Sequence, residues 1–228
     1  MSSLISSYPT RRPLLSPESV FYAPEEHLFC EDWSEMRRIR LPETNLVVLK
    51  RPVPEFSGAI SEILAHSTGE SQTLFERGMS LDLIPAMLDD DLDLESPDSL
   101  GLYLDIRDLA EKFLSVTSAK KIGVRLERVQ TDSCRLFHVD RVGVRLLTTY
   151  FGDGTEWLKN SDVNRAGLGQ GNDQLVKMDG AATQVIPAGW IGLLKGERGN
   201  DGLGLVHRSP RVEAAKKKRV LLRMDTLD

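Results

Sequence analysis

The sequence predicts an α+β fold in which helices precede a C-terminal β sandwich, jelly roll or barrel. Nine of the 11 prolines lie before residue 98, whereas 13 of the 18 glycines lie between Gly143 and Gly204. The spacing of apolar residues also changes near Ile122, from about 3.6 residues, typical of helices, to about 2, typical of strands. With 228 residues, 40% of them hydrophobic, the chain can bury one substantial core.

Composition and charge exclude several classes of protein. Cys30 and Cys134 are too few for a disulfide framework. The N-terminus lacks the apolar stretch of a secretory signal, and no apolar run reaches the roughly 20 residues of a membrane span. We therefore expect a cytoplasmic protein without a membrane partner. A net charge of −5 disfavours a nucleic-acid partner, and we interpret the basic run 216–219 and the acidic stretch 89–98 as solvated loops.

The first half of the chain predicts an extension followed by a helical layer. Residues 1–45 are rich in proline and poor in periodic apolar residues, which predicts an irregular N-terminal extension. Residues 46–228 are expected to form a single domain, whose residues 46–120 are mostly helical. The expected elements of this layer are a strand at Leu46–Leu49, short helices at Ser57–His66 and Gln72–Met79, and a longer helix at Ser96–Ser118.

The longer helix has a capping serine, Ser96, a proline in its first turn and one apolar stripe. That stripe is expected to pack on a sheet built by residues 121–228. From Ile122 onward, apolar and polar residues alternate. Strands are expected at Ile122–Glu127, Val142–Tyr150, Leu175–Met178, Thr183–Ile186, Ile191–Leu194, Gly204–His207 and Val220–Met224.

One constellation of residues is suited to metal binding. His138 and Asp140 precede the strand over Val142–Tyr150, and residues i and i+2 of an extended chain point to the same face. His207, the only later histidine, would supply a third ligand. Two imidazoles and one carboxylate leave a face of the metal open, as in non-haem Fe(II) sites. The alternative is structural, with both histidines satisfied by Asp140, a backbone carbonyl or a turn.

The order of the later motifs resembles the double-stranded β-helix of the Fe(II)/2-oxoglutarate oxygenase superfamily. His138-Val139-Asp140 is followed by the turn Pro187-Ala188-Gly189 into an apolar strand, then by His207, and then by Arg219 at the start of the last strand. The segments CRLFHVDRVGVRLLTTYFGDGTEWL and GLVHRSP resemble the bacterial family called domain of unknown function 1826. The resemblance covers about residues 122–225. It implies N-terminal helices packed on a C-terminal double-stranded β-helix, a jelly-roll or cupin-like barrel.

The resemblance also implies roles for individual residues, none of them a catalytic acid, base or nucleophile. His138, Asp140 and His207 would bind the metal. Arg219 would pair with the distal carboxylate of 2-oxoglutarate, and Arg223, four residues further on, is the substitute candidate.

A further hydrogen-bond donor to the co-substrate is expected from the strand that follows the metal motif. Arg145 and Tyr150 lie on opposite faces of this strand, so only one can face the pocket. We choose Tyr150 because it is an even number of positions from Asp140 and so would lie on the same face of a regular strand. Where the superfamily commonly has a serine two residues after the arginine, this chain has Leu221, which puts the co-substrate pocket in question.

The leading hypothesis is Fe(II)- and 2-oxoglutarate-dependent oxidation of an unidentified small-molecule or protein substrate. A second hypothesis is a non-catalytic metal-binding protein, with zinc held by the same three residues and Cys134. A third is a cupin-like barrel that binds a small ligand or a partner without metal. The sequence does not indicate the oligomeric state.

Overall fold

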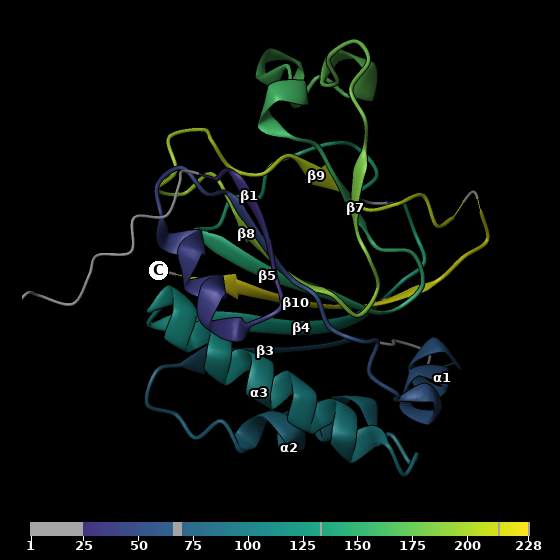
Figure 1. Cartoon of the computed structure of the whole chain (residues 1–228). Helices are drawn as coiled ribbons and strands as arrows, with labels where there is room; N and C mark the ends of the chain where they lie inside the picture. Colours follow the sequence, from purple (N-terminus) through teal and green to yellow (C-terminus); the bar gives the residue numbers. More distant parts are fainter. Residues whose placement is uncertain (1–24, 66–69, 133, 214, 228) are drawn as a thin grey trace, which may run out of the picture.

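The chain forms two β-sheets of unequal size with the α-helices on one side (Figure 1). The computed structural model describes residues 25–65, 70–132, 134–213 and 215–227. The large sheet has the order β1-β2-β8-β5-β10-β4-β3 and the small sheet the order β7-β6-β9. The strands are β1 (His27–Cys30), β2 (Leu46–Leu49), β3 (Glu70–Glu76), β4 (Lys121–Val129), β5 (Val144–Phe151), β6 (Thr155–Trp157), β7 (Gln184–Ile186), β8 (Ile191–Lys195), β9 (His207–Arg208) and β10 (Arg219–Thr226).

The helices lie mainly in the first half of the described chain. They are the α-helices α1 (Ser57–Ala65), α2 (Leu83–Leu92) and α3 (Ser99–Thr117), and the 3₁₀ helices η1 (Trp33–Arg40), η2 (Asn160–Asp162), η3 (Arg165–Gly167) and η4 (Asp173–Leu175). In Figure 1, α2 and α3 lie below the large sheet and the small sheet lies above it. The protein is therefore a mixed α and β structure, as predicted, and its main element is one large sheet.

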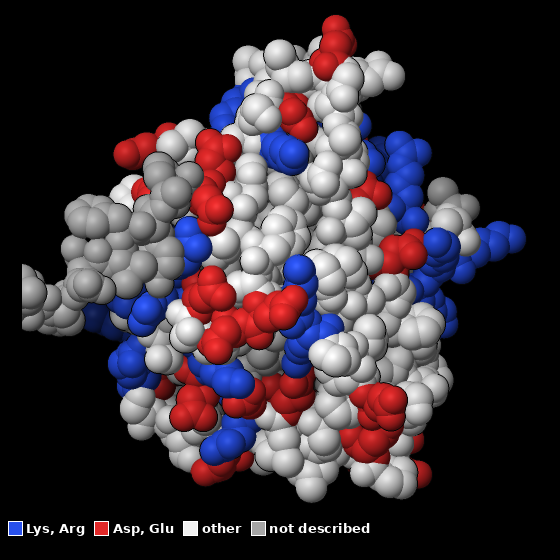
Figure 2. All heavy atoms as spheres, in the orientation of Figure 1, with Lys and Arg blue, Asp and Glu red and all other residues white. Residues whose placement is uncertain are grey.

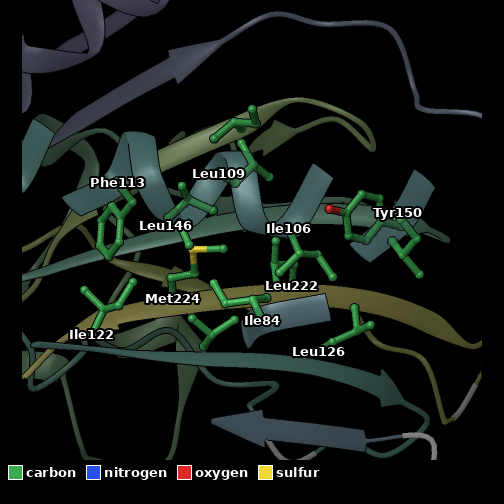
Figure 3. Close-up of a cluster of buried hydrophobic side chains, with 14 of the residues drawn as sticks. Ile84, Ile106, Leu109, Phe113, Ile122, Leu126, Leu146, Tyr150, Leu222 and Met224 are labelled. Atoms are coloured by element: carbon green, nitrogen blue, oxygen red, sulfur yellow. The ribbon is translucent and has the colours of Figure 1, made fainter. Parts of the chain in front are cut away.

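The face of the large sheet that meets α3 is apolar. The stripe predicted for this helix packs on the sheet with residues of β4, β5 and β10 (Figure 3). The buried side chains of this core include Ile106, Leu109, Phe113, Ile122, Leu146, Leu222 and Met224. Because full burial of such a side chain contributes about 1.5–3 kcal/mol, this core is the main source of stability. A smaller apolar cluster lies between the two sheets and includes Leu147, Trp157 and Leu221.

Two elements of the predicted helical layer differ from the prediction. Residues 72–79, expected to be helical, belong largely to strand β3, in which Ser71, Thr73 and Phe75 are buried and the intervening residues are exposed. Pairing with β4 therefore overrides the local helical tendency. The following segment forms α2, which buries Ile84 and Leu88 and was not predicted.

The segment at residues 25–45 is also more ordered than the irregular extension predicted for it. Strand β1 pairs in parallel with β2, and η1 packs against it with Met36 and Ile39 fully buried. The pairing of β1 at the edge of the large sheet and the burial of these apolar side chains hold this segment in place, although its sequence has no long periodic pattern of apolar residues. Residues 1–24 of the predicted extension lie outside the described residues.

Two further local predictions are corrected. Helix α3 begins at Ser99, and Ser96 does not cap it; instead Ser96 donates a hydrogen bond to Asp98. Asp98 in turn accepts hydrogen bonds from the amides of Gly58 and Ala59, and so caps the start of α1. The strand predicted at 175–178 is absent, because this segment belongs to a connection with η2, η3 and η4 between β6 and β7.

The charged runs are largely exposed, as predicted. Lys216, Lys217 and Lys218 lie in the loop before β10, and Figure 2 shows basic side chains gathered on that side of the molecule. Asp89, Asp90 and Asp91 are exposed on α2. Arg219, the last member of the basic run, is the exception because it is buried. None of the helices in the described ranges is long and apolar enough to cross a bilayer.

Candidate metal centre

His138 and His207 lie side by side because their backbones pair. The amide of His138 donates to the carbonyl of His207 over 2.9 Å, and the reverse hydrogen bond measures 3.0 Å. His207 belongs to β9, which pairs with β6 in the small sheet. The two imidazole ring centroids are 4.7 Å apart. An antiparallel bridge thus joins two histidines that are 69 positions apart in the sequence.

Backbone carbonyls fix the orientation of both rings. Nδ1 of His138 lies 2.9 Å from the carbonyl oxygen of Leu136, and Nδ1 of His207 lies 3.2 Å from that of Leu205. A carbonyl only accepts hydrogen bonds, so each Nδ1 carries a proton, and in the neutral form of the ring Nε2 keeps its lone pair. This is the tautomer in which Nε2 can bind a metal.

Asp140 is held against the two histidines by Arg145. The Arg145 guanidinium donates through Nη1 to Oδ1 of Asp140, and through Nε and Nη2 to Asp225 over 2.5 and 2.8 Å. Oδ2 of Asp140 lies 3.2 Å from Nε2 of His207 and is buried without a hydrogen bond. Arg145, anchored on β10 by Asp225, therefore occupies Oδ1 of the carboxylate and leaves Oδ2 facing His207.

The three side chains meet the geometric requirement for one shared ion. Their ligating atoms all lie within 4.8 Å of one another. Two neutral imidazoles and one carboxylate suit a divalent transition metal, and a buried carboxylate oxygen without a donor is the kind of atom that an ion would satisfy. The donor set therefore fits the metal that the sequence motif implied.

The electrostatics of the cluster keep Asp140 ionised. Burial opposes the charged form, but His207, His138 and Arg145 together hold the pKa of Asp140 well below its usual range. Burial also opposes protonation of His138, yet the Asp140 carboxylate and the Leu136 carbonyl raise its pKa above the usual value.

Arg219 lies buried in the same cavity as the histidines. It is 1% exposed and donates to the hydroxyl groups of Ser209, Thr149 and Thr155 at 2.9, 2.9 and 3.1 Å. Within the described part of the chain, no carboxylate forms an ion pair with it, and its Nε has no acceptor. Burial lowers its pKa to about 10, so the group is still a cation at neutral pH.

The cavity has a volume of about 440 Å³. It is lined by His138, His207, Arg219, Arg223, Arg145 and Cys134, among other residues. The Cys134 side chain is exposed, and it is not a member of the group whose ligating atoms lie within 4.8 Å. Among the described residues, the geometry thus offers three ligands for one ion and leaves part of its coordination open.

Tyr150, chosen from the sequence as a pocket donor, lies on the other face of the sheet. Its hydroxyl donates to Asp105 of α3 over 2.6 Å, and Figure 3 shows the ring among apolar core side chains near Ile106. The choice was wrong because residues alternate between the two faces only along a continuous strand. Residues 141–143 are not extended strand, so counting positions from Asp140 does not give the face of Tyr150. Arg145, the alternative, is the member of the pair that lines the cavity.

Several residues of the site were not identified from the sequence. Ser209 follows His207 by two positions and so shares its face in an extended segment, which was a usable signal. Its hydroxyl accepts a hydrogen bond from Arg219. Thr155 and Asp225 gave no comparable signal, because their places depend on how β5, β6 and β10 pair.

The chain is similar to several solved structures that share little sequence identity with it. The dioxygenase for auxin oxidation 1 from Arabidopsis thaliana, in complex with 2-oxoglutarate, superposes with a TM-score of 0.50, 10% identity, and coverage of 88% of this chain and 91% of that chain. The rice dioxygenase for auxin oxidation gives a TM-score of 0.47, 16% identity and coverage of 86% and 78%. A putative oxygenase from Shewanella oneidensis gives a TM-score of 0.45, 14% identity and coverage of 88% of both chains.

No curated protein matches the chain in sequence. A family model does: the one described as "Protein of unknown function (DUF1826)" matches residues 30–225. This range contains the three candidate metal ligands, Arg219 and all the strands except part of β1 and the end of β10. Since the match spans most of the sequence, the chain belongs to the DUF1826 family.

Proposed function

We propose that this protein is an Fe(II)- and 2-oxoglutarate-dependent oxygenase. The observation that carries the proposal is that one cavity is lined both by the two histidines of a His-Asp-His ligand set and by a buried arginine without a carboxylate partner among the described residues. Either feature alone has structural explanations. Together they match the two groups that such an oxygenase must hold, a divalent iron and a dicarboxylic co-substrate.

The metal would be held by Nε2 of His138, Nε2 of His207 and Oδ2 of Asp140. The carbonyls of Leu136 and Leu205 fix the two rings, and Arg145 fixes the carboxylate. Orientation of ligands by such neighbours strengthens metal binding. Three protein ligands leave sites for a co-substrate and oxygen, whereas a closed structural zinc site usually has four.

The distal carboxylate of 2-oxoglutarate would bind Arg219. A guanidinium is suited to a bidentate contact with a carboxylate, and burial strengthens that attraction. Ser209, Thr149 and Thr155 hold the guanidinium in place and add hydroxyl groups to the pocket. These hydroxyl groups support a 2-oxoglutarate pocket here although Leu221 supplies none.

The iron and 2-oxoglutarate, when bound, supply oxidation of a substrate coupled to decarboxylation of the co-substrate. The chain itself fixes three ligands in an open geometry, orients the co-substrate and restricts access of water. We also assign the two sheets to a double-stranded β-helix with helices on the outer face of the larger sheet. Residues 46–228 would form its single domain, joined by β1 and η1.

The proposal is tested with anaerobic protein to which Fe(II) and then 2-oxoglutarate are added. We expect a visible charge-transfer band from the chelated co-substrate. His207→Ala should abolish the band, and Arg219→Met should require at least roughly tenfold more 2-oxoglutarate, since an ionic hydrogen-bonded contact is lost. Lys218→Met is the matched control, because it removes an exposed cation one position away.

The contrary outcome is equally specific. If the wild-type protein gives no band but retains zinc through dialysis, and loses it in Cys134→Ala, the protein is a metal-binding barrel and not an oxygenase. Formation of succinate from 2-oxoglutarate in air provides an independent readout of activity.

A further inference from the structure

A carboxylate outside the metal centre joins the two chain segments that carry its histidines. Asp173 is the first residue of η4, in the connection between β6 and β7 that lies above β9 in Figure 1. Its Oδ1 accepts a hydrogen bond from the amide of Phe137, the residue before His138, over 2.8 Å. Its Oδ2 accepts one from Nη1 of Arg208, the residue after His207. One side chain thus binds the chain neighbours of both candidate ligands.

The bridge between the two histidines explains why one carboxylate can reach both segments. Because His138 and His207 are partners in an antiparallel bridge, Phe137 and Arg208 form the next pair. In agreement, the guanidinium carbon of Arg208 lies 4.3 Å from the centre of the Phe137 ring. Successive residues of an extended chain point to opposite faces, and of these four residues only the histidines line the cavity. Asp173 therefore holds the bridge from the face opposite the metal ligands.

Arg208 lies between two carboxylates. Its Nε donates to Glu156 over 2.6 Å, and Glu156 is also its direct partner in the register of β6 and β9. The side chains of Arg208, Glu156 and Asp173 are between 18 and 23% exposed. Solvent screens such partly buried ion pairs less than it screens exposed ones. The three charges therefore hold β6, β9 and the segment before His138 in one arrangement.

The connection that carries Asp173 has other contacts that hold it in place. The amide of Asn164 donates to the carbonyl of Val176 over 2.7 Å, and the amide of Met178 donates to that of Asp162 over 2.9 Å. Val176 is 2% exposed and packs in an apolar cluster. Loss of the Asp173 carboxylate would therefore leave the connection folded and would act mainly on the histidine bridge.

His138 depends on such support more than His207 does. His207 belongs to β9, which pairs with β6, and its side chain is 5% exposed. His138 lies outside the named strands, at an isolated bridge, and its side chain is 35% exposed. Groups that hold metal ligands in position contribute about 10–100-fold to metal affinity. A carboxylate that ties the neighbour of His138 to the neighbour of His207 has that position here.

We propose that Asp173 is a positioning residue of the metal centre, which fixes His138 against His207 through Phe137 and Arg208. It acts on the backbone that carries the ligands and not on the ion itself. The inference rests on the proposed function only in that His138 and His207 bind a divalent metal. It depends neither on 2-oxoglutarate nor on oxidation of a substrate.

The test measures metal binding by titration of the metal-free full chain with Co(II), whose visible spectrum reports the geometry of its ligands. Asp173→Asn should weaken Co(II) binding roughly tenfold or more and change the spectrum of the bound ion. Asparagine keeps an acceptor for the Phe137 amide but directs an NH₂ group at Arg208. Asp179→Asn is the matched control, because it removes an exposed carboxylate from the same connection, and it should change neither readout.

Further variants separate positioning from stability. Arg208→Gln should weaken Co(II) binding about as much as Asp173→Asn, and the double variant should be little weaker than either, because both changes break one ion pair. Asp173→Glu keeps the charge and should restore part of the affinity. In the metal-free protein, the amide of His138 should exchange its hydrogen faster in Asp173→Asn than in the wild type, because the bridge opens more often.

A purely structural role for Asp173 has a different signature. If Asp173→Asn lowers the melting temperature but leaves the affinity and spectrum of Co(II) unchanged, the inference is wrong. It is also wrong if Asp179→Asn weakens binding equally.

Failure of the proposed function is distinguishable from failure of this inference. If Co(II) binding depends on His207 and Asp173 but Fe(II) and 2-oxoglutarate give no visible band, the oxygenase proposal fails and the role of Asp173 stands. If the band forms in the wild type and Asp173→Asn binds Co(II) as tightly as the wild type, only this inference fails. If the wild type binds no Co(II), both fail.

Discussion

The two faces of the large sheet are built from alternate residues of the same strands, yet they differ in almost every physical respect. On β10, Val220, Leu222 and Met224 enter the core between the large sheet and α3, whereas Arg219 and Arg223 enter the cavity. The core face gains stability from apolar burial. The cavity face buries charged groups, and their desolvation opposes folding. Stability and the candidate chemistry therefore depend on different sides of one sheet.

The largest expected effect is on the core face. Leu222→Ala should lower the free energy of unfolding by about 2–5 kcal/mol, because a fully buried side chain is removed and a cavity remains. Denaturant unfolding measures the change. Leu221→Ala, the adjacent residue on the cavity face, should have a smaller effect because its side chain is 8% exposed and already borders the cavity. Equal losses in the two variants would mean that the two faces contribute alike to stability.

A smaller effect is expected for Tyr150→Phe. The hydroxyl of Tyr150 donates to Asp105, which Arg51 also binds through two nitrogens, so about 1 kcal/mol should be lost. Metal and 2-oxoglutarate affinities should not change, and both are measured by titration alongside the melting temperature. A weaker affinity for 2-oxoglutarate would show that Tyr150 acts on the cavity side after all.

The smallest effect on stability is expected for Arg219→Met, within about 1 kcal/mol and of either sign. Removing a buried cation that has no carboxylate partner among the described residues also removes its desolvation penalty. Arg51→Met is the matched control, because it leaves Asp105 without its bidentate partner and should destabilise more. Urea unfolding of both variants decides the order, and the reverse order would mean that Arg219 is mainly structural.

The sequence was informative where a residue and its neighbours in the chain act together. His138 and Asp140 are two positions apart, and the structure brings them together with His207 as their spacing indicated. Helix α3 could be predicted from its own stripe of apolar residues, without knowledge of any other element. Strand β3 could not be predicted in this way. The alternation of buried and exposed residues along it is explained only by its pairing with β4.

Residue roles that depend on two or more strands were beyond the sequence. Arg219 follows three lysines, and this local pattern indicates one more solvated cation, so only the family resemblance pointed to a pocket role. In the structure, hydroxyl groups from β5 and β6 enclose it. Tyr150 and Arg145 could be told apart only once the irregular chain between Asp140 and β5 was known. The contacts of Asp173 with the neighbours of both histidines likewise depend on the bridge between His138 and His207.

The change from helices to strands near residue 120, the apolar stripe of α3 and the residue types available for a metal centre could all be inferred from the amino-acid sequence. They depend on periodicity and on side-chain chemistry, which are local properties of the chain. The folded arrangement was needed to learn which polar side chains meet in the cavity and which face of the sheet each one takes. Strand order, register and breaks in a strand set those contacts, and they arise from pairing between segments far apart in the sequence.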